Sequence, residues 1–127
     1  MGRDTDEAAV RALFQRNAEA ANLRDVEGVV ATYWPDGDVQ IAGRPRVSGP
    51  EALRQTELDW QATPGYRGWE GRVEEIRFLA SDAALVEITA TTLLHDSEIA
   101  EQTTIVVSRR DGEWRISAWR VMVVEDR

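Results

Sequence analysis

The chain has 127 residues, a formal net charge of −8 and no cysteine. The length suits one domain over residues 1–127, and the lack of cysteine excludes disulfides, thiolate metal sites and a cysteine nucleophile. The negative charge argues against nucleic-acid binding, because phosphate affinity requires clustered positive charge. No membrane-length apolar run is present, which favours a soluble, cytoplasmic protein without a membrane partner. All fifteen basic residues are arginine, as in proteins from GC-rich bacterial genomes.

The first predicted element is a helix from Asp4 to Asn22, with Asp4 and Glu7 as a capping box. Its apolar stripe contains one polar residue, Asn17. A polar side chain in such a stripe needs hydrogen bonds or water. Asn17 is therefore either a structural residue satisfied by nearby groups, which we favour, or part of a polar cavity.

A second, short helix is expected to begin after the N-cap Asp25 and to end before Pro35. Tyr33 and Trp34 continue its apolar spacing. Asp36-Gly37 is typical of a turn, and a short hairpin should follow, with a strand through Ile41 and a reversal at Gly43 to Pro45. The third helix is predicted from Pro50 to Ala62, with its inward residues at Leu53, Thr56 and Trp60.

Four long strands are predicted over residues 67–80, 84–95, 98–109 and 113–124. A two-residue loop at Asp96-Ser97 would pair Thr92 with Glu101, and one at Asp111-Gly112 would pair Thr103 with Arg120. The first strand needs an extra residue near Ser81 to Ala83 to keep its apolar side chains inward.

In this register one face of the sheet is apolar, apart from a polar group of Thr92, Glu101, Thr103 and Arg120. The opposite face would carry apolar residues, including Trp119, between threonines. A face of this composition is typical of a surface covered by a second subunit, which predicts a homodimer.

Two passages, NLRDVEGVVATYWPDGDVQIAG and RRDGEWRISAWRV, resemble the nuclear-transport-factor-like cone fold and its SnoaL-like branch. The resemblance implies an α+β fold: a cone-shaped, strongly curved, mainly antiparallel sheet with three N-terminal helices packed on its concave face. It also implies a cavity and, commonly, a dimer through the sheet. The superfamily includes ketosteroid isomerases, polyketide cyclases, dehydratases, epoxide hydrolases and members without known activity.

The functional residues of ketosteroid isomerases do not carry over. The resemblance puts Ile41 where their basic Asp stands and Asn17 where their oxyanion Tyr stands, and an isoleucine cannot move a proton. His95 is the only histidine and should lie exposed at a hairpin tip. A lone histidine cannot support the usual metal clusters, so we expect neither a metal nor a cofactor.

The remaining candidate site combines Glu101 as a general acid or base with Arg120 as a group that binds an anionic oxygen. A structural ion pair between them is the alternative that we favour at this point. The ligand-binding candidates also include aromatic residues, which are more often core residues than ligand contacts. These candidates are Asn17, Tyr33, Trp34, Ile41, Trp60, Thr92 and Thr103.

Two functions remain open from the sequence. The first is binding of a small apolar molecule, up to a polycyclic one in size, with an isomerase, cyclase or hydrolase type of activity. The second is a non-catalytic dimerisation or protein-interaction module whose cavity is filled by side chains. A cavity of roughly 300 Å³ or more beside Glu101 and Arg120 would favour the first.

Overall fold

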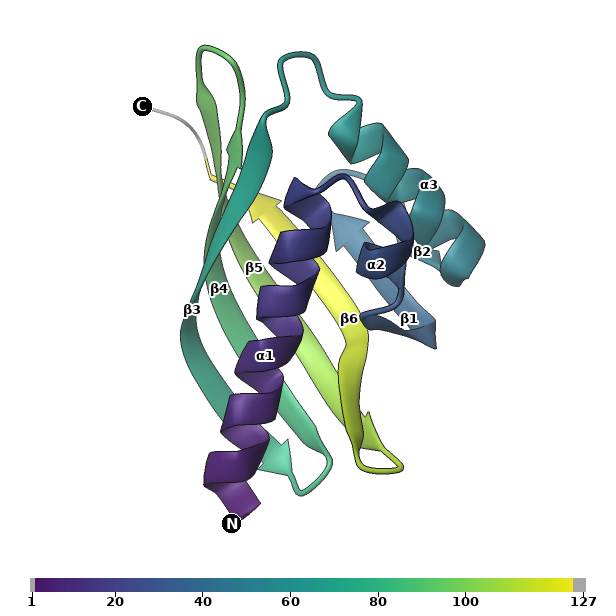
Figure 1. The fold of residues 1–127 in the computed structure, drawn as a ribbon, viewed down its shortest axis with the longest axis vertical. Helices are drawn as coiled ribbons and strands as arrows, with labels where there is room; N and C mark the ends of the chain where they lie inside the picture. The colour runs from purple at the N-terminus through teal and green to yellow at the C-terminus, as the bar shows by residue number, and fades with distance from the viewer. Residues whose placement is uncertain (1, 125–127) are drawn as a thin grey trace.

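A computed structural model describes residues 2–124. Three helices lie on one face of a curved six-stranded sheet (Figure 1). The elements are α1 (Gly2–Asn22), α2 (Val26–Val30), β1 (Tyr33–Ile41), β2 (Val47–Ser48), α3 (Pro50–Gln61), β3 (Gly68–Ala80), β4 (Ala83–Leu93), β5 (Glu98–Arg110) and β6 (Glu113–Val123). No helix within residues 2–124 has both the length and the apolar character needed to span a membrane.

The strand order in the sheet is β2-β1-β6-β5-β4-β3. Four neighbouring pairs are antiparallel, and β1 runs parallel to β6. The α+β fold class with a curved, mainly antiparallel sheet under three helices is therefore confirmed. The four long strands begin and end within two residues of the predicted bounds.

The helix α1 packs its predicted apolar stripe onto the sheet, with Val10 and Leu13 fully buried. It begins at Gly2, so Asp4 lies inside the first turn instead of capping it. Glu7 forms an ion pair with Arg11 one turn later. The predicted capping box is wrong because the helix extends two residues further toward the N-terminus.

The short helix α2 begins as predicted, because Asp25 Oδ1 accepts a hydrogen bond from the Gly28 backbone N–H at 3.0 Å. It ends at Val30, however, and Tyr33 already belongs to β1. The predicted helical positions of Tyr33 and Trp34 are wrong. Backbone pairing with β6 ends the helix early, since the Ile116 N–H donates to the Thr32 carbonyl at 2.8 Å.

The predicted turn at Asp36-Gly37 is also wrong, because β1 continues through it with an irregular register between Tyr33 and Asp38. Gly37 is needed there for close packing. A Cβ at this position would lie 2.9 Å from the Ile116 carbonyl oxygen. The glycine therefore permits a close approach between β1 and β6.

The β4–β5 register differs from the prediction by two residues, so Glu101 lies opposite Ala90 and Thr92 opposite Ile99. A shift of two residues keeps every side chain on its predicted face. The longer loop accounts for the shift, because the Leu94 N–H donates to the Ser97 carbonyl inside the loop.

The β5–β6 pair contains a bulge that the sequence did not predict. Val107 lies opposite Ile116, but the next pair is Val106 with Ala118, so Ser117 is an extra residue. Beyond it, each β6 side chain faces away from its predicted side. Trp119 and Val121 therefore point inward, and Arg120 points outward.

A third irregularity lies in β3 between Phe78 and Ala80, slightly before the predicted position at Ser81 to Ala83. It leaves Leu79 57% exposed while Phe78 and Ile76 pack against the core. The reason for an extra residue was therefore correct, although its position was not.

Candidate functional site

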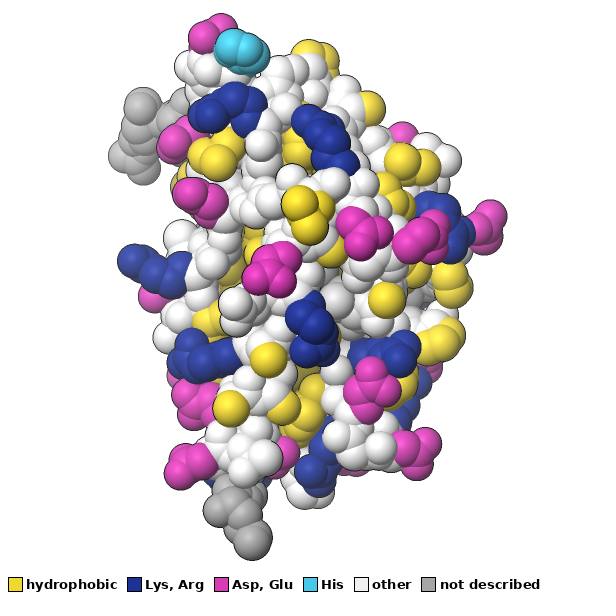
Figure 2. Space-filling view, in the orientation of Figure 1, with side chains coloured by type: hydrophobic (Ala, Val, Ile, Leu, Met, Phe, Trp, Pro, Cys, Tyr) yellow, Lys and Arg dark blue, Asp and Glu magenta, His cyan; other side chains and the backbone are white. Residues whose placement is uncertain are grey.

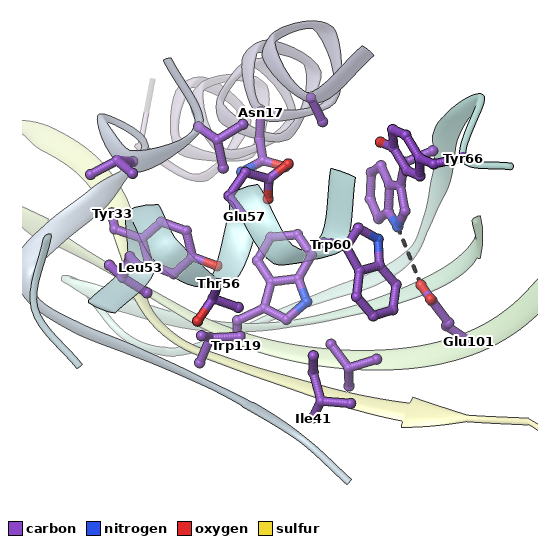
Figure 3. A pocket seen from close by; sticks show the side chains of 16 residues that line it. Asn17, Tyr33, Ile41, Leu53, Thr56, Glu57, Trp60, Tyr66, Glu101 and Trp119 are labelled. Carbon is purple, nitrogen blue, oxygen red and sulfur yellow. Dashed lines mark hydrogen bonds between the residues drawn. The ribbon is translucent and has the colours of Figure 1, made fainter. Parts of the chain in front are cut away.

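A partly open pocket of about 80 Å³ lies between the concave face of the sheet and the helices (Figure 3). Its volume is below the roughly 300 Å³ at which ordinary small-molecule sites begin. Its walls are mainly apolar and aromatic. They are formed by Asn17, Ala21, Val29, Val30, Tyr33, Val39, Ile41, Leu53, Thr56, Glu57, Trp60, Tyr66, Trp69, Glu101, Trp119 and Val121.

Glu101 supplies a carboxyl group to the wall and is only 2% exposed. Its Oε1 accepts a hydrogen bond from Trp69 Nε1 at 3.2 Å, drawn as the dashed line in Figure 3. Its Oε2 accepts one from Thr92 Oγ1 at 2.8 Å. Burial raises the pKa of Glu101, and the hydrogen bonds from Thr92 and Trp69 oppose this shift only in part.

The alternation of β5 places this carboxyl inward. Glu101, Thr103, Ile105 and Val107 all point to the concave face, and all are buried. Thr103 does not reach the pocket, because its hydroxyl donates to the Ile88 carbonyl at 2.9 Å. Thr92 lies behind Glu101 on β4 and acts through it.

Trp69 is held in place by the last residue of α1. The Asn22 amide donates to the Trp69 carbonyl at 2.9 Å, and its oxygen accepts from the Trp69 backbone N–H at 2.8 Å. Gly71 leaves the space that the indole occupies, since a Cβ there would lie 2.4 Å from the ring. The position of this indole over Glu101 therefore depends on two residues outside the pocket.

Trp119 is the central ring of the aromatic wall. Its centroid lies 6.0 Å from that of Trp69, 6.3 Å from that of Tyr33 and 6.0 Å from that of Phe14. Tilted and edge-on pairs at such distances are favourable aromatic arrangements. The rings therefore support one another around the pocket without filling it.

The half-buried residues of the pocket mark its mouth, and α3 contributes Thr56, Glu57 and Trp60 to it. Glu57 accepts a hydrogen bond from Gln61 Nε2 at 2.8 Å. Burial raises the pKa of Glu57, and the Gln61 hydrogen bond opposes the shift. The pocket thus contains two carboxyl groups whose ionised forms are both disfavoured by burial.

Asn17 and Tyr66 add neutral polar groups. Asn17 Nδ2 donates to Thr32 Oγ1 at 2.9 Å, so the amide is satisfied within the protein as predicted and also lines the pocket. The Tyr66 hydroxyl is buried and has no hydrogen-bond partner among residues 2–124. Burial raises the pKa of Tyr66, with further contributions from the negative charges of Glu57 and Glu101 opposed by Arg24.

The structure brings five of the nine predicted site residues together in the pocket wall: Asn17, Tyr33, Ile41, Trp60 and Glu101. Thr92 and Thr103 lie directly behind the wall. Trp34 lies elsewhere, donating to the Ser108 carbonyl at 2.9 Å under the guanidinium groups of Arg110 and Arg115. Its predicted place over the cavity is wrong because it belongs to β1.

The predicted position of Arg120 beside Glu101 is also wrong. Arg120 Nη1 donates to Asp38 Oδ1 at 2.7 Å on the outer side of the sheet, opposite Thr104 instead of Thr103. The bulge at Ser117 is the physical reason. An ion pair does exist at Arg120, but its acid is Asp38 and not Glu101.

Eleven of the sixteen pocket residues were not among the predicted site residues, among them Glu57, Tyr66, Trp69 and Trp119. Glu57 had a visible signal, because Leu53, Thr56, Glu57 and Trp60 follow the i, i+3, i+4, i+7 spacing of one helix face. No sequence signal placed Trp119 in the pocket, because the bulge at Ser117, which was not predicted, turns its side chain to the concave face of the sheet.

His95 is exposed at the β4–β5 loop as predicted, and it is the cyan side chain at one end of the molecule in Figure 2. Across the described residues, no three His, Cys, Asp or Glu side chains come together in a group that could hold a metal ion.

No family model and no curated protein sequence matches the chain. Solved structures do resemble it. A ketosteroid isomerase-like protein from Erwinia carotovora atroseptica has a TM-score of 0.81 at 22% identity, covering 94% of this chain and 96% of that one. An NTF-2-like protein of unknown function from Shewanella oneidensis has a TM-score of 0.77 at 17% identity, covering 92% and 98%.

A third structure, hexachlorocyclohexane dehydrochlorinase LinA-type3 from Novosphingobium barchaimii, has a TM-score of 0.76 at 19% identity and covers 98% of this chain and 90% of that one. Sequence identities this low support a shared fold but do not show a shared activity. The chain has the nuclear-transport-factor-like cone fold that its sequence resembles.

Proposed function

We propose that this protein binds a small molecule with a largely apolar body in the pocket, and that Glu101 exchanges a proton with that molecule. The observation that carries the proposal is a buried glutamate in the wall of a partly open aromatic pocket. A protein core gains nothing from an isolated carboxyl group, because its burial disfavours the charged form. Such groups with raised pKa values cluster at functional sites.

The chemistry of Glu101 suits general acid–base catalysis. A carboxyl group with a raised pKa holds its proton closer to neutral pH and can both release and accept it. Isomerase, cyclase and hydrolase reactions all need a positioned proton carrier of this kind. The resemblance to ketosteroid isomerases puts Ile41 where their basic Asp stands, and Ile41 and Glu101 line the same pocket from different strands. Glu101 is therefore the group to which we assign proton transfer.

The names of two structures with this fold support a small-molecule site, since one is described as ketosteroid isomerase-like and the other as a hexachlorocyclohexane dehydrochlorinase. The enclosed volume of about 80 Å³ favours a ligand near the size of a single ring. A polycyclic molecule would have to extend through the mouth between α3 and the strand ends.

The proposal is tested by titrating benzyl alcohol and benzylamine while the indole N–H signals are followed by NMR. We expect the Trp60, Trp69 and Trp119 signals to shift because these rings line the pocket. The Trp34 signal is the internal control, since its N–H donates to Ser108 outside the pocket.

A pair of variants on α3 separates pocket binding from surface binding. Thr56→Phe places a ring in the mouth and should abolish the shifts, whereas Gln55→Phe adds the same ring at an exposed position and should not. If neither probe moves the pocket signals, or if Thr56→Phe leaves the shifts intact, the proposed function is overturned.

The second candidate is a non-catalytic dimerisation or protein-interaction module with a filled cavity. It is favoured by the small pocket volume and by half-buried apolar residues on the outer sheet face, among them Leu85, Val106 and Ala118. Met122 is 60% exposed beside them. Pocket indoles that respond to no probe would support this candidate.

A further inference from the structure

The pocket contains two carboxyl groups and no basic side chain. None of its lining residues is an arginine or histidine. Glu101 is hydrogen-bonded by Trp69 and Thr92, and Glu57 by Gln61, so every partner is neutral. Within residues 2–124, neither carboxylate takes part in an ion pair.

Two exposed acids of this protein differ from the pocket carboxyl groups. Glu27 and Asp36 each pair with an arginine, which lowers their pKa values through hydrogen bonds to the guanidinium. Even these exposed carboxylates have a cation beside them, whereas the two in the pocket do not. A buried charge is costly unless it is paired.

The aromatic rings show the same contrast. The face of an aromatic ring attracts a cation electrostatically. Trp34, outside the pocket, has the guanidinium groups of Arg110 and Arg115 each 4.9 Å from its ring centroid. Among the described residues, no guanidinium stacks on Trp60, Trp69 or Trp119. The three pocket indoles are therefore available to a ligand, whereas the Tyr66 ring has the Arg24 guanidinium 5.1 Å from its centroid.

Tyr66 provides an independent sign of a missing partner. Its hydroxyl is buried, with the residue only 7% exposed, and it bonds to nothing in the described protein. A buried polar atom without a hydrogen-bond partner destabilises the folded protein. Tyr66, Glu57 and Glu101 all line the same pocket. Figure 3 shows Tyr66, Glu57 and Glu101 around the pocket.

Building on the proposed function, we propose that the ligand is a small organic cation, a protonated amine with an apolar body. Its apolar part lies against the indoles of Trp60, Trp69 and Trp119. Its ammonium group donates a hydrogen bond to Tyr66 Oη and faces the carboxylates of Glu57 and Glu101.

Ligands of other charge fit less well. A neutral alcohol or ketone would satisfy Tyr66 but leave both carboxyl groups without a counter-ion. An anion would meet two acids and no cation. A protonated amine alone complements the hydroxyl, the carboxylates and the ring faces together.

Three probes that share one ring separate these cases: benzylammonium, benzyl alcohol and benzoate, titrated at pH 7.5 with indole N–H shifts as the readout. We expect benzylammonium to bind about tenfold more tightly than benzyl alcohol, the ratio that 1.4 kcal/mol of cation recognition supplies. Benzoate should show no binding at the pocket.

Two variants assign the binding and its selectivity to the pocket. Glu57→Gln removes one of the two acids and should reduce the preference for benzylammonium over benzyl alcohol several-fold. Tyr66→Phe removes a hydroxyl that either ligand can use, so it should weaken the binding of both. Asp59→Asn is the matched control, because it removes the same charge from the same helix at an exposed position. This control should retain the preference.

The outcomes separate this inference from the proposed function. If benzyl alcohol or benzoate binds as tightly as benzylammonium, the inference fails and small-molecule binding stands. If none of the three binds, both fail. If Asp59→Asn lowers the preference as much as Glu57→Gln, the selectivity comes from the acidic surface and the inference again fails.

Discussion

The two halves of the concave sheet face are built from the same strands but differ in character. One half, which we call the closed half, contains Ala84, Val86, Val107, Trp114 and Ile116, and all of these are at most 4% exposed. The other, the open half, contains Thr92, Glu101, Trp69 and Trp119 around the pocket. The well-packed side chains of the closed half can stabilise the fold. The open half can therefore contain a pocket and a buried carboxyl group.

The largest expected effect comes from breaking the closed half. Ile116→Ala removes a fully buried side chain and should lower the free energy of unfolding by about 2–5 kcal/mol, because the cavity cannot collapse completely. Urea denaturation measures the loss. Glu101→Gln in the open half is the comparison and should change stability by no more than about 1 kcal/mol at neutral pH, since both hydrogen bonds can be kept. Equal losses would remove the distinction between the halves.

A smaller effect is expected in the pH dependence of stability. The folded-state pKa of Glu101 is raised by burial, so the folded protein holds this proton more tightly than the unfolded chain. Its contribution to stability is therefore greatest below the unfolded pKa, about 4.3, and is lost as pH rises through the folded pKa. The Glu101→Gln variant has no carboxyl group at this position, so it does not lose stability in this way as pH rises.

The stability difference between Glu101→Gln and the wild type should therefore shift in favour of the variant as pH rises from about 4 toward neutrality. Urea denaturation at several pH values measures this trend. Glu57 is present in both proteins, so its own titration cancels. Parallel curves for the two proteins would show that Glu101 titrates normally.

The smallest effect is expected outside both halves, at Arg120. Its partner Asp38 is partly exposed, and such surface pairs contribute about 0.2–1 kcal/mol. Arg120→Met should therefore lower stability by no more than about 1 kcal/mol and leave benzylammonium binding unchanged. A large loss of binding would mean that Arg120 acts on the pocket after all.

The sequence predicted the elements of the sheet well because strand alternation and turn residues are local signals. It predicted that Glu101 faces inward, since a two-residue shift in register preserves the face. It failed at Tyr33 and Trp34, because five apolar residues between positions 26 and 34 fit a helical stripe. The deciding contact is a parallel pairing with β6, over eighty residues away.

The site was predicted in part for the same reason. Asn17, Ile41, Trp60 and Glu101 follow from helix and strand periodicity. Arg120 and Trp119 exchanged faces because Ser117 inserts one residue, and no glycine or proline marks that position. Tyr66 lies between α3 and β3, where periodicity says nothing about the direction of a side chain.

The bulge at Ser117 also decides which β6 side chains point into the pocket, and therefore whether β6 contributes a charged group to it. Before it, even-numbered β6 residues such as Trp114 and Ile116 point inward; after it, odd-numbered ones such as Trp119 do. If Ser117 were paired in simple alternation instead of bulging out, Arg120 would lie opposite Thr103 and point inward in place of Trp119. The same strand, paired without its bulge, would then offer a guanidinium to anions where it now offers an indole.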